Sequence, residues 1–258
     1  MRWRPLLQNV RDRLVEIAER PPPLTPPVVP FTLVCVYRKE NAQNVIALRP
    51  QLGSTYLWAL DSVDSKLKEV TYGQGPGNRF ELLNKLLSFR ASSDDWLVVV
   101  DDDVRLTRGS LAFAVGTAAL GAFDLSGISH SRWSYLNWGC TLHKTNSIAR
   151  VTRYVEQGPS LILSPKAQRV LLPFPEDIGM GWGVEAIWGG KRELRLGTLD
   201  AVHLRHLRPV NRSVYGVDSE WAQAMSLLES SGFSSWSEMQ RTLETWNYGQ
   251  ATPPWNSE

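Results

Sequence analysis

The stretch that decides the fold reads Asp94-Asp95-Trp96-Leu97-Val98-Val99-Val100-Asp101-Asp102-Asp103-Val104. Its apolar centre is unbroken and rich in β-branched side chains, which is typical of a strand buried on both faces of a parallel sheet. Ligands of open α/β sheets bind beyond the carboxyl ends of the strands, where the last three carboxylates would lie. Because adjacent carboxylates repel one another, a cation such as Mg²⁺ or Mn²⁺ would relieve them. The alternative is a solvated acidic turn whose Asp side chains cap the next helix.

The rest of the chain alternates short apolar runs with segments of helical spacing. Strands are predicted before the acidic stretch over 31–37, 55–60 and 68–72, and after it over 125–129, 149–156, 160–163 and 196–202. Helices are predicted over 45–52, 78–90, 107–123 and 165–172, with further helical segments after 184 and after 217. This alternation predicts an α/β fold with right-handed βαβ units and a Rossmann-like, mostly parallel sheet flanked by helices.

Composition excludes several classes of protein. The 258 residues carry a net charge of only +2, which gives no reason to expect nucleic-acid binding. Two cysteines, Cys35 and Cys140, make neither a disulfide framework nor a four-thiolate zinc site. No run reaches the roughly 18 apolar residues of a membrane span, and residues 1–5 lack a signal-peptide pattern. A cytoplasmic setting is therefore the expectation.

Three parts of the chain are expected. Residues 1–30 combine an amphipathic helix over 6–20 with a stiff proline-rich spacer. Residues 31–215 form the α/β domain, and residues 216–258 form a C-terminal helical extension. The N-terminal helix would most simply dock on the body, and the alternatives are pairing with a partner or peripheral contact with a membrane surface.

Three features follow one another along the α/β domain. A strand ends in Asp101-Asp102-Asp103, the segment Gly181-Trp182-Gly183-Val184-Glu185 comes later, and a strand end with His203 and His206 comes last. In this order they resemble the GT-A class of nucleotide-sugar glycosyltransferases, over about residues 31–210. The resemblance implies a GT-A fold and a metal-dependent enzyme. Such an enzyme moves a sugar from a nucleotide donor to a hydroxyl acceptor, in polysaccharide or glycoconjugate synthesis for example.

The resemblance also assigns the metal ligands. Asp103 matches the second Asp of the Asp-x-Asp motif, which holds Mn²⁺ or Mg²⁺ on the diphosphate. Asp101 matches the first, which reaches the ribose or the metal, and Asp102 lies between them on the nucleotide side. Side chains at i and i+2 of an extended chain point the same way, which supports this pairing. His206, followed by a basic Arg-Pro stretch, matches the late metal-binding His better than His203 does.

Glu185 is the candidate catalytic residue. In inverting enzymes of this class, the acid after Gly-Trp-Gly removes the proton from the attacking acceptor hydroxyl, as a general base must. The alternative is that Glu185 only favours the N-terminus of the following helix. Trp182 and Gly183 are expected to face the acceptor, with Trp182 as a floor for a sugar ring, although some of the 11 tryptophans must be core. Glu156 is a further candidate on the acceptor side.

Basic and amide side chains near the strand ends are candidates for nucleotide binding. Arg38 follows the first strand, Asn78 and Arg79 follow a glycine-rich turn at 73–77, and Arg208 follows the last strand. Each could contact the base or the phosphates, and a solvated surface charge is the alternative. The spacing of the glycines is not that of a dinucleotide fingerprint.

Two other functions fit the same residues. A Mg²⁺-dependent phosphohydrolase or nucleotidyltransferase also places acids at strand ends, although it usually needs a second acidic cluster. A non-catalytic sugar-binding protein could retain the fold without turnover. Release of nucleoside diphosphate only when an acceptor is present would identify a transferase.

Overall fold

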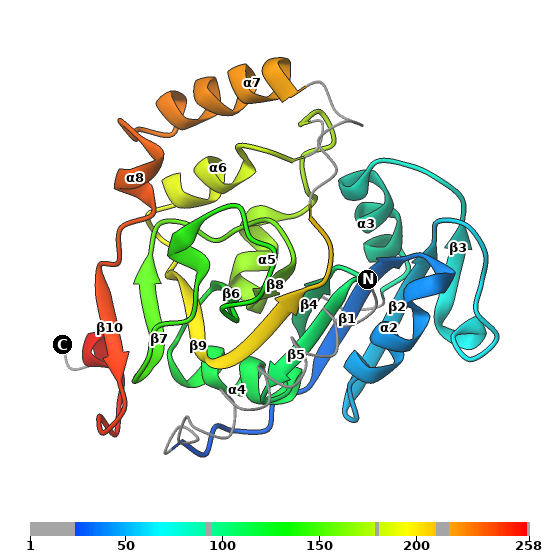
Figure 1. Ribbon diagram of the computed structural model, residues 1–258, viewed down its shortest axis with the longest axis horizontal. Coiled ribbons are helices and arrows are strands. Elements are labelled where there is room, and N and C mark those ends of the chain that lie inside the picture. The colour runs from blue at the N-terminus through cyan, green and yellow to red at the C-terminus, as the bar shows by residue number, and fades with distance from the viewer. Residues whose placement is uncertain (1–23, 91–93, 179–180, 210–216, 257–258) are drawn as a thin grey trace, which may run out of the picture.

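The computed structural model describes residues 24–90, 94–178, 181–209 and 217–256 (Figure 1). The predicted helix over 6–20 lies outside these residues. The strands are β1 Phe31–Tyr37, β2 Gly53–Ala59, β3 Thr71–Gln74, β4 Trp96–Val100, β5 Val104–Arg108, β6 Leu125–His130, β7 Ser147–Thr152, β8 Ser160–Leu163, β9 Leu196–His206 and β10 Glu244–Asn247. The helices are α2 Ala42–Leu48, α3 Arg79–Ser88, α4 Leu111–Leu120, α5 Pro165–Leu171, α6 Val184–Gly190, α7 Val217–Ser230 and α8 Trp236–Met239.

One mixed sheet contains every described strand, in the order β10-β7-β9-β6-β8-β4-β1-β2-β3, with β5 pairing with β9 off this path. The half formed by β4, β1, β2 and β3 is parallel throughout, and β6 is parallel to β9. The antiparallel pairs all involve β5, β7 or β8, so every other described strand runs in one direction. The predicted α/β class with a mostly parallel sheet is confirmed.

Side chains that alternate along β4 divide the core into two layers. Val98 and Val100 join the apolar cluster that holds α2 and α4, whereas Leu97 and Val99 join the cluster that holds α3, α5 and α6. All four side chains are at most 1% exposed, and burying each of them contributes about 2 kcal/mol. Helices therefore cover both faces of the sheet, which is why β4 is apolar at every position.

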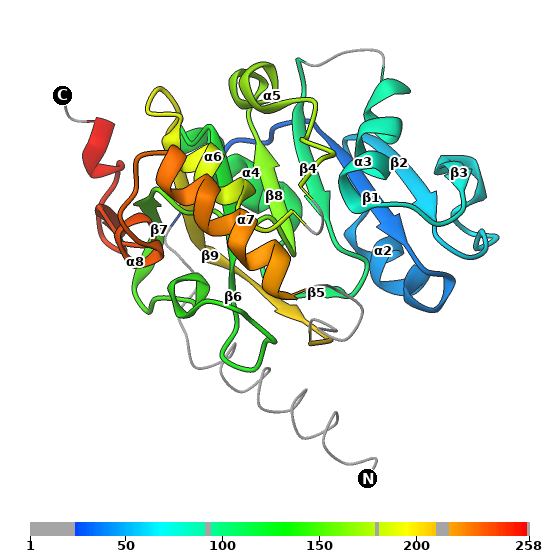
Figure 2. The same cartoon turned by 90° about the horizontal axis from the view of Figure 1, so that it is seen from above.

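A third, smaller cluster lies outside α6. Buried side chains of α6, α7 and α8 meet there, among them Ala186, Leu228 and Met239. Figures 1 and 2 show α7 lying alongside α6, on the side of α6 away from the sheet. The predicted C-terminal helices are thus present, and they form an additional layer on the body.

Two secondary-structure predictions are wrong where a strand pairs with a distant partner. The helix predicted over 107–123 begins only at Leu111, because residues 104–108 form β5 against β9 and Ser110 caps the helix by accepting a hydrogen bond from the Phe113 N–H. Residues 244–247, predicted as helical, form β10 against β7, and Trp246 on this strand is fully buried. Residues 68–70, predicted as the start of a strand, instead form a 3₁₀ turn, and the strand β3 begins at Thr71.

The described residues include no helix with both the length and the apolar character needed to span a bilayer.

Candidate functional site

The ends of four strands meet at one edge of the sheet. The backbone N–H of Arg38, after β1, donates to the Asp102 carboxylate at 2.6 Å, and the N–H of Asp101, after β4, donates to the carbonyl of Pro159, before β8. The N–H of Leu207, after β9, donates to the carbonyl of Asp103 at 2.9 Å. This edge is where ligands of α/β sheets bind, as the acidic stretch predicts.

The three carboxylates occupy a turn between β4 and β5, and they face different partners. Asp101 pairs with Arg79, with 2.9 Å between Oδ1 and the guanidinium nitrogen. Asp102 is 5% exposed, and its Oδ2 accepts hydrogen bonds from the Arg38 N–H and the Asn41 side-chain amide. Burial raises the pKa of Asp102, against the effect of these bonds. Asp102 therefore fastens the loop after β1 instead of facing the pocket described below.

Pairing of β5 with β9 brings His206 to the acidic turn. Val104 lies opposite His206 in the register, and His206 Nε2 lies 3.1 Å from Asp103 Oδ1. Burial favours the neutral ring, but the hydrogen bond and charge of Asp103 raise the pKa of His206. His203, the other candidate, is buried, and its Nε2 contacts the carbonyl of Asp200. Of the two histidines, His206 is the one at the acidic turn.

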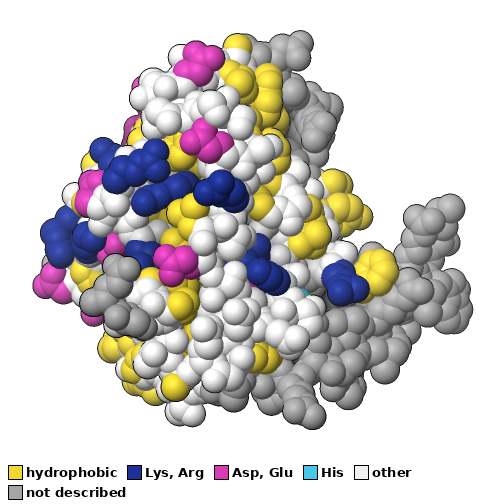
Figure 3. Space-filling view, turned by 90° about the vertical axis from the view of Figure 1, so that its left-hand side faces the viewer, with side chains coloured by type: hydrophobic (Ala, Val, Ile, Leu, Met, Phe, Trp, Pro, Cys, Tyr) yellow, Lys and Arg dark blue, Asp and Glu magenta, His cyan; other side chains and the backbone are white. Residues whose placement is uncertain are grey.

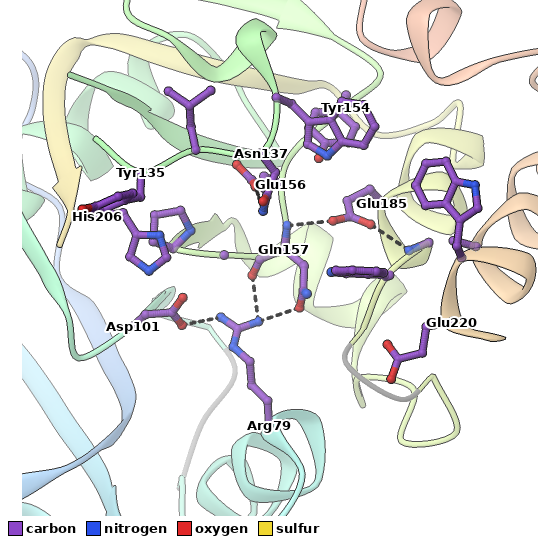
Figure 4. Close-up of a pocket in the computed structure, with 18 of the residues that line it drawn as sticks. Arg79, Asp101, Tyr135, Asn137, Tyr154, Glu156, Gln157, Glu185, His206 and Glu220 are labelled. Carbon is purple, nitrogen blue, oxygen red and sulfur yellow. Dashed lines mark hydrogen bonds and ion pairs between the residues drawn. The ribbon is translucent and has the colours of Figure 1, made fainter. Parts of the chain in front are cut away.

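A pocket of about 890 Å³ opens beside this turn (Figure 4). It gathers most of the side chains predicted for the site, namely Asn78, Arg79, Asp101, Glu156, Trp182, Gly183, Glu185 and His206. Asp103 reaches the pocket through its contact with His206. Arg38, Asp102 and Arg208 do not line it, and Arg208 pairs with Glu40 at the exposed surface. The structure thus brings residues predicted to bind the metal, the nucleotide and the acceptor into one pocket. It leaves three residues that were predicted to bind the nucleotide outside this pocket.

Arg79 connects the acidic turn to the segment before β8. Its guanidinium donates to Asp101 Oδ1 and to both the carbonyl and the side-chain oxygen of Gln157, at 2.8–3.0 Å (Figure 4). Gly158 lies against the same carboxylate, since a Cβ there would stand 2.8 Å from Asp101 Oδ2. Asp101 and Gln157 are therefore held in fixed positions on the floor of the pocket.

Glu185 lies in the first turn of α6 and is 5% exposed. Its carboxylate accepts hydrogen bonds from the N–H of Gly183, at 3.1 Å, and of Gln157, at 3.3 Å. Burial nevertheless raises the pKa of Glu185 to about 7, against these bonds and the nearby charge of Arg79. A carboxyl group that titrates near neutrality inside a pocket is suited to proton transfer.

The glycines around Trp182 are required by this geometry. Gly181 and Gly183 have φ angles of +90° and +94°, a region that disfavours other residues. A Cβ on Gly181 would stand 2.6 Å from the Gln157 side chain, and one on Gly183 would stand 2.8 Å from Cα of Ala224 in α7. The Gly-Trp-Gly segment therefore allows α7 to pack directly on the backbone that presents Glu185.

Glu156 is a second carboxyl group in the pocket, and its side chain is 11% exposed. Its Oε1 accepts a hydrogen bond from the side chain of Asn137, whereas its Oε2 is buried without a hydrogen-bond partner, 3.6 Å from His130 Nε2. Burial raises the pKa of Glu156 to about 8 and lowers that of His130 to about 4. Both shifts favour the neutral forms of these groups over an ion pair between them.

Aromatic side chains also line the pocket, and Figure 4 shows one of them, Tyr154, across from Asp101 and His206. Trp138 comes from the loop before β7, Tyr154 follows β7, Trp221 lies on α7 and Trp236 begins α8. The aromatic and polar stretch at 131–143, which contains Trp138, indicates a substrate loop in the sequence, whereas Trp221 and Trp236 lie on helical segments for which the sequence indicates no role. The spacing of these two tryptophans does not indicate a binding site, because a stripe of apolar residues on a helix usually packs in the core.

A second pocket, of about 550 Å³, lies at the β10 side of the molecule. Figure 3 shows Lys and Arg side chains gathered on that face, with acidic side chains among them. Lys166 pairs there with Asp124, and Glu193 and Glu244 line the same pocket as Arg153 and Arg192. This pocket has mixed charge and does not share residues with the first.

The donor atoms at the acidic turn suit a hard divalent cation, since carboxylate and imidazole both bind Mn²⁺. Among the described residues, no three His, Cys, Asp or Glu side chains are gathered as a complete metal site. Asp103 and His206 form a ligand pair, whereas Asp101 is turned to Arg79. This pair fits a metal whose remaining ligands come from a bound substrate, as is common for phosphate-bridging ions.

Comparison with known proteins gives structural matches only. No family model matches the chain, and no curated protein matches its sequence. The solved structures that it resembles include a mannosyltransferase, PcManGT from Pyrobaculum calidifontis, in complex with GDP-Man and Mn²⁺. The TM-score is 0.54 at 17% identity, covering 88% of this chain and 70% of that one. S. aureus TarS 1–349 in complex with UDP-GlcNAc matches with a TM-score of 0.54 at 13% identity, covering 81% of this chain and 69% of that one.

GalNAc-T7, solved with UDP, GalNAc and Mn²⁺, matches with a TM-score of 0.53 at 9% identity over 71% of this chain. The present chain spans 44% of the length of that protein. These likenesses establish the fold. The chain has the GT-A fold of nucleotide-sugar glycosyltransferases, which confirms the fold that the acidic turn, the Gly-Trp-Gly segment and the late His implied.

Proposed function

We propose that this protein is a metal-dependent glycosyltransferase that moves a sugar from a nucleotide-sugar donor to a hydroxyl group of an acceptor. The observation that carries the proposal is the position of Glu185. This carboxyl group is buried, has a pKa of about 7, and lies in the same pocket as Asp101 and His206. The fold supports the proposal, since the solved structures that resemble this chain include complexes with UDP-GlcNAc and with GDP-Man.

The donor would occupy the side of the pocket that faces the acidic turn. Asn78 and Arg79 line it there, at the N-terminus of α3, where backbone N–H groups and the helix dipole favour an anion. Asp103 and His206, with Asp101 beside them, would hold Mn²⁺ or Mg²⁺. The bound ion would stabilise the negative charge that develops on the departing diphosphate. Arg38 and Arg208 lie outside the pocket, so a role in nucleotide binding remains a prediction for both.

Glu185 would act as the general base. Its carboxylate removes the proton of the acceptor hydroxyl as that oxygen attacks the anomeric carbon of the donor sugar. The bond from the anomeric carbon to the diphosphate oxygen breaks, and the nucleoside diphosphate leaves with the electron pair. The two backbone N–H groups that bind Glu185 orient its carboxylate, and Trp182 and Gly183, which line the same pocket, would face the acceptor. Direct attack from the opposite side would invert the anomeric configuration.

A thermal-shift screen of nucleoside diphosphates, each with and without Mn²⁺, tests the donor site. A ligand that binds the folded state raises the melting temperature by mass action. We expect one nucleoside diphosphate to stabilise the protein only with Mn²⁺, and Asp103→Ala to abolish this shift. Lys68→Ala, on the far side of β2 from the acidic turn, serves as the control and should retain it.

Turnover then separates transfer from hydrolysis. With the identified donor, a transferase releases nucleoside diphosphate faster when an acceptor is added. A phosphohydrolase would release phosphate without one, and a sugar-binding protein would release nothing. A native protein that no nucleoside diphosphate stabilises, with metal present, would contradict the proposed function.

A further inference from the structure

Three tryptophans from separate parts of the chain stack on one another at the pocket. Trp138 lies 6.4 Å from Trp221 and 5.9 Å from Trp236, measured between ring centroids, with interplanar angles of 23° and 25°. Tyr154 meets the edges of Trp138 and Trp236 in T-shaped contacts. We call Trp138, Tyr154, Trp221 and Trp236 the aromatic wall.

The aromatic wall is only partly core. Tyr154 is 2% exposed and packs among buried residues of α6 and α7, so one end of the wall is fixed. Trp221 is 42% exposed, although all four side chains of the wall line the pocket. Large aromatic surface that stays exposed beside a pocket is commonly a ligand contact.

The aromatic wall lies beside Glu185, the proposed base. Trp221 lies on α7, three residues before Ala224, whose Cα packs against Gly183. Gly183 in turn donates its N–H to Glu185. Trp138 follows Asn137, which donates to Glu156. The wall therefore borders the two carboxyl groups.

The carboxyl groups at this end of the pocket disfavour an anionic ligand. Glu156, Glu185 and Glu220 line it, whereas Arg79, the guanidinium in the same pocket, is already paired with Asp101. An anionic ligand next to Glu185 would be repelled by its carboxylate whenever that group is ionised, and Glu185 must be ionised to act as the base. A neutral ring with hydroxyl groups has no such cost. Its C–H face can pack on indole, and its hydroxyls can bond to the carboxyl groups and to Asn137.

We propose that the aromatic wall is the acceptor subsite, and that the acceptor group which it binds is an uncharged sugar ring stacked on Trp221. This inference rests on the proposed function, because it assigns the acceptor of that reaction. It gives the C-terminal helices α7 and α8 a role in acceptor binding, apart from the metal and the donor.

Direct binding of methyl glycosides to the full chain tests the inference without requiring turnover. The probes are the neutral methyl glycosides of glucose, galactose, mannose and N-acetylglucosamine, with methyl glucuronide as the anionic match of methyl glucoside. We expect saturation-transfer NMR to detect at least one neutral glycoside and not methyl glucuronide. Trp221→Ala should weaken the binding about tenfold, and Trp221→Phe should weaken it less because a flat ring remains.

Trp133→Ala is the matched control, since Trp133 is also an exposed tryptophan but does not line the pocket. It should leave glycoside binding unchanged. The Mn²⁺-dependent thermal shift by nucleoside diphosphate should be the same in all three variants. This readout also shows that each variant is folded.

Three results would overturn the inference: no neutral glycoside binds the native protein, methyl glucuronide binds as well as methyl glucoside, or Trp221→Ala binds glycosides normally. Each can occur while nucleoside diphosphates still bind with Mn²⁺, in which case the proposed function stands and the acceptor assignment fails. Loss of nucleotide binding in the native protein would instead contradict the proposed function itself.

Discussion

Burial and hydrogen bonding together set the pKa of Glu185. Two backbone N–H groups stabilise its carboxylate, but desolvation outweighs them and raises its pKa to about 7. A general base works only in its ionised form. We therefore expect kcat/KM for transfer to rise about tenfold per pH unit below pH 7 and to level off above it. A pH profile from 5.5 to 9, at saturating Mn²⁺, measures this, and a rate that falls with pH over this range would contradict the assignment.

Substitution of the same residue separates catalysis from binding. Glu185→Gln removes the base while keeping the size of the side chain, and we expect it to lower kcat by about a hundredfold or more. The thermal shift by nucleoside diphosphate with Mn²⁺ should persist, since the proposed mechanism places Glu185 beside the acceptor and not at the metal. Glu193→Gln, in the second pocket, is the control and should transfer normally. Equal activity of the two variants would exclude Glu185 as the base.

At the scale of an element, Gly183 sets the position of α7. Gly183→Ala would force a side chain into a φ of +94° and against Cα of Ala224 at 2.8 Å. Gly249→Ala provides the comparison, since Gly249 has a φ of +90° but a Cβ added there would meet no atom within 4 Å. The second variant should cost about 1 kcal/mol of unfolding free energy, and the first about 2 kcal/mol more. Urea denaturation measures both unfolding free energies. Equal losses in the two variants would mean that α7 can move away from the added Cβ at no cost in stability.

The pair of Arg150 and Asp200 holds the loop that carries Trp138. Arg150 on β7 donates twice to Asp200 on β9, and also to the carbonyls of Cys140 and Leu142. Asp200 is fully buried, so Arg150→Met would leave an unpaired charge that costs roughly 3–5 kcal/mol. We expect the melting temperature to fall by about 10 °C. Addition of Asp200→Leu should recover part of the loss, whereas a further fall would show that the hydrogen bonds from the Lys144 N–H and the Ser147 hydroxyl to Asp200 outweigh the cost of its unpaired charge.

The elements also show what the sequence could predict. The apolar run before Asp101, the Gly-Trp-Gly segment before Glu185 and the strand end at His206 are local patterns, and the structure places all three residues in one pocket. The strands β5 and β10 were missed, because each is short and depends on a partner far away in the chain. Trp221 and Trp236 of the aromatic wall were missed for the same reason. The side chains of the wall come from separate segments, and only the packing of α7 on Gly183 brings Trp221 to the pocket.

For the molecule as a whole, the pocket links function to stability. The pKa values of Glu156 and Glu185 are raised to about 8 and about 7 by burial, so the folded state binds their protons more tightly than the unfolded state does. Their contribution to stability is complete below about pH 4.5 and is lost as the pH rises through the folded pKa values. His130 has the opposite sign, because its lowered pKa of about 4 makes the folded state lose stability below pH 6.5.

Glu156→Gln isolates one of these contributions. The amide keeps the acceptor for Asn137 and places an N–H₂ group near His130 Nε2, but it cannot ionise. The groups that face Glu156 are Asn137, His130, Glu185 and, at longer range, His206 and Asp101, and all of them remain in the variant. We expect the variant to match the native protein at pH 4.5 and to be more stable by about 1 kcal/mol or more at pH 8.5, since each unit of pKa shift corresponds to about 1.4 kcal/mol. Urea denaturation at the two pH values measures the difference. A variant that is less stable than the native protein at pH 8.5 would mean that the folded state stabilises the ionised carboxylate. Glu156 would then be charged in the pocket when the acceptor binds.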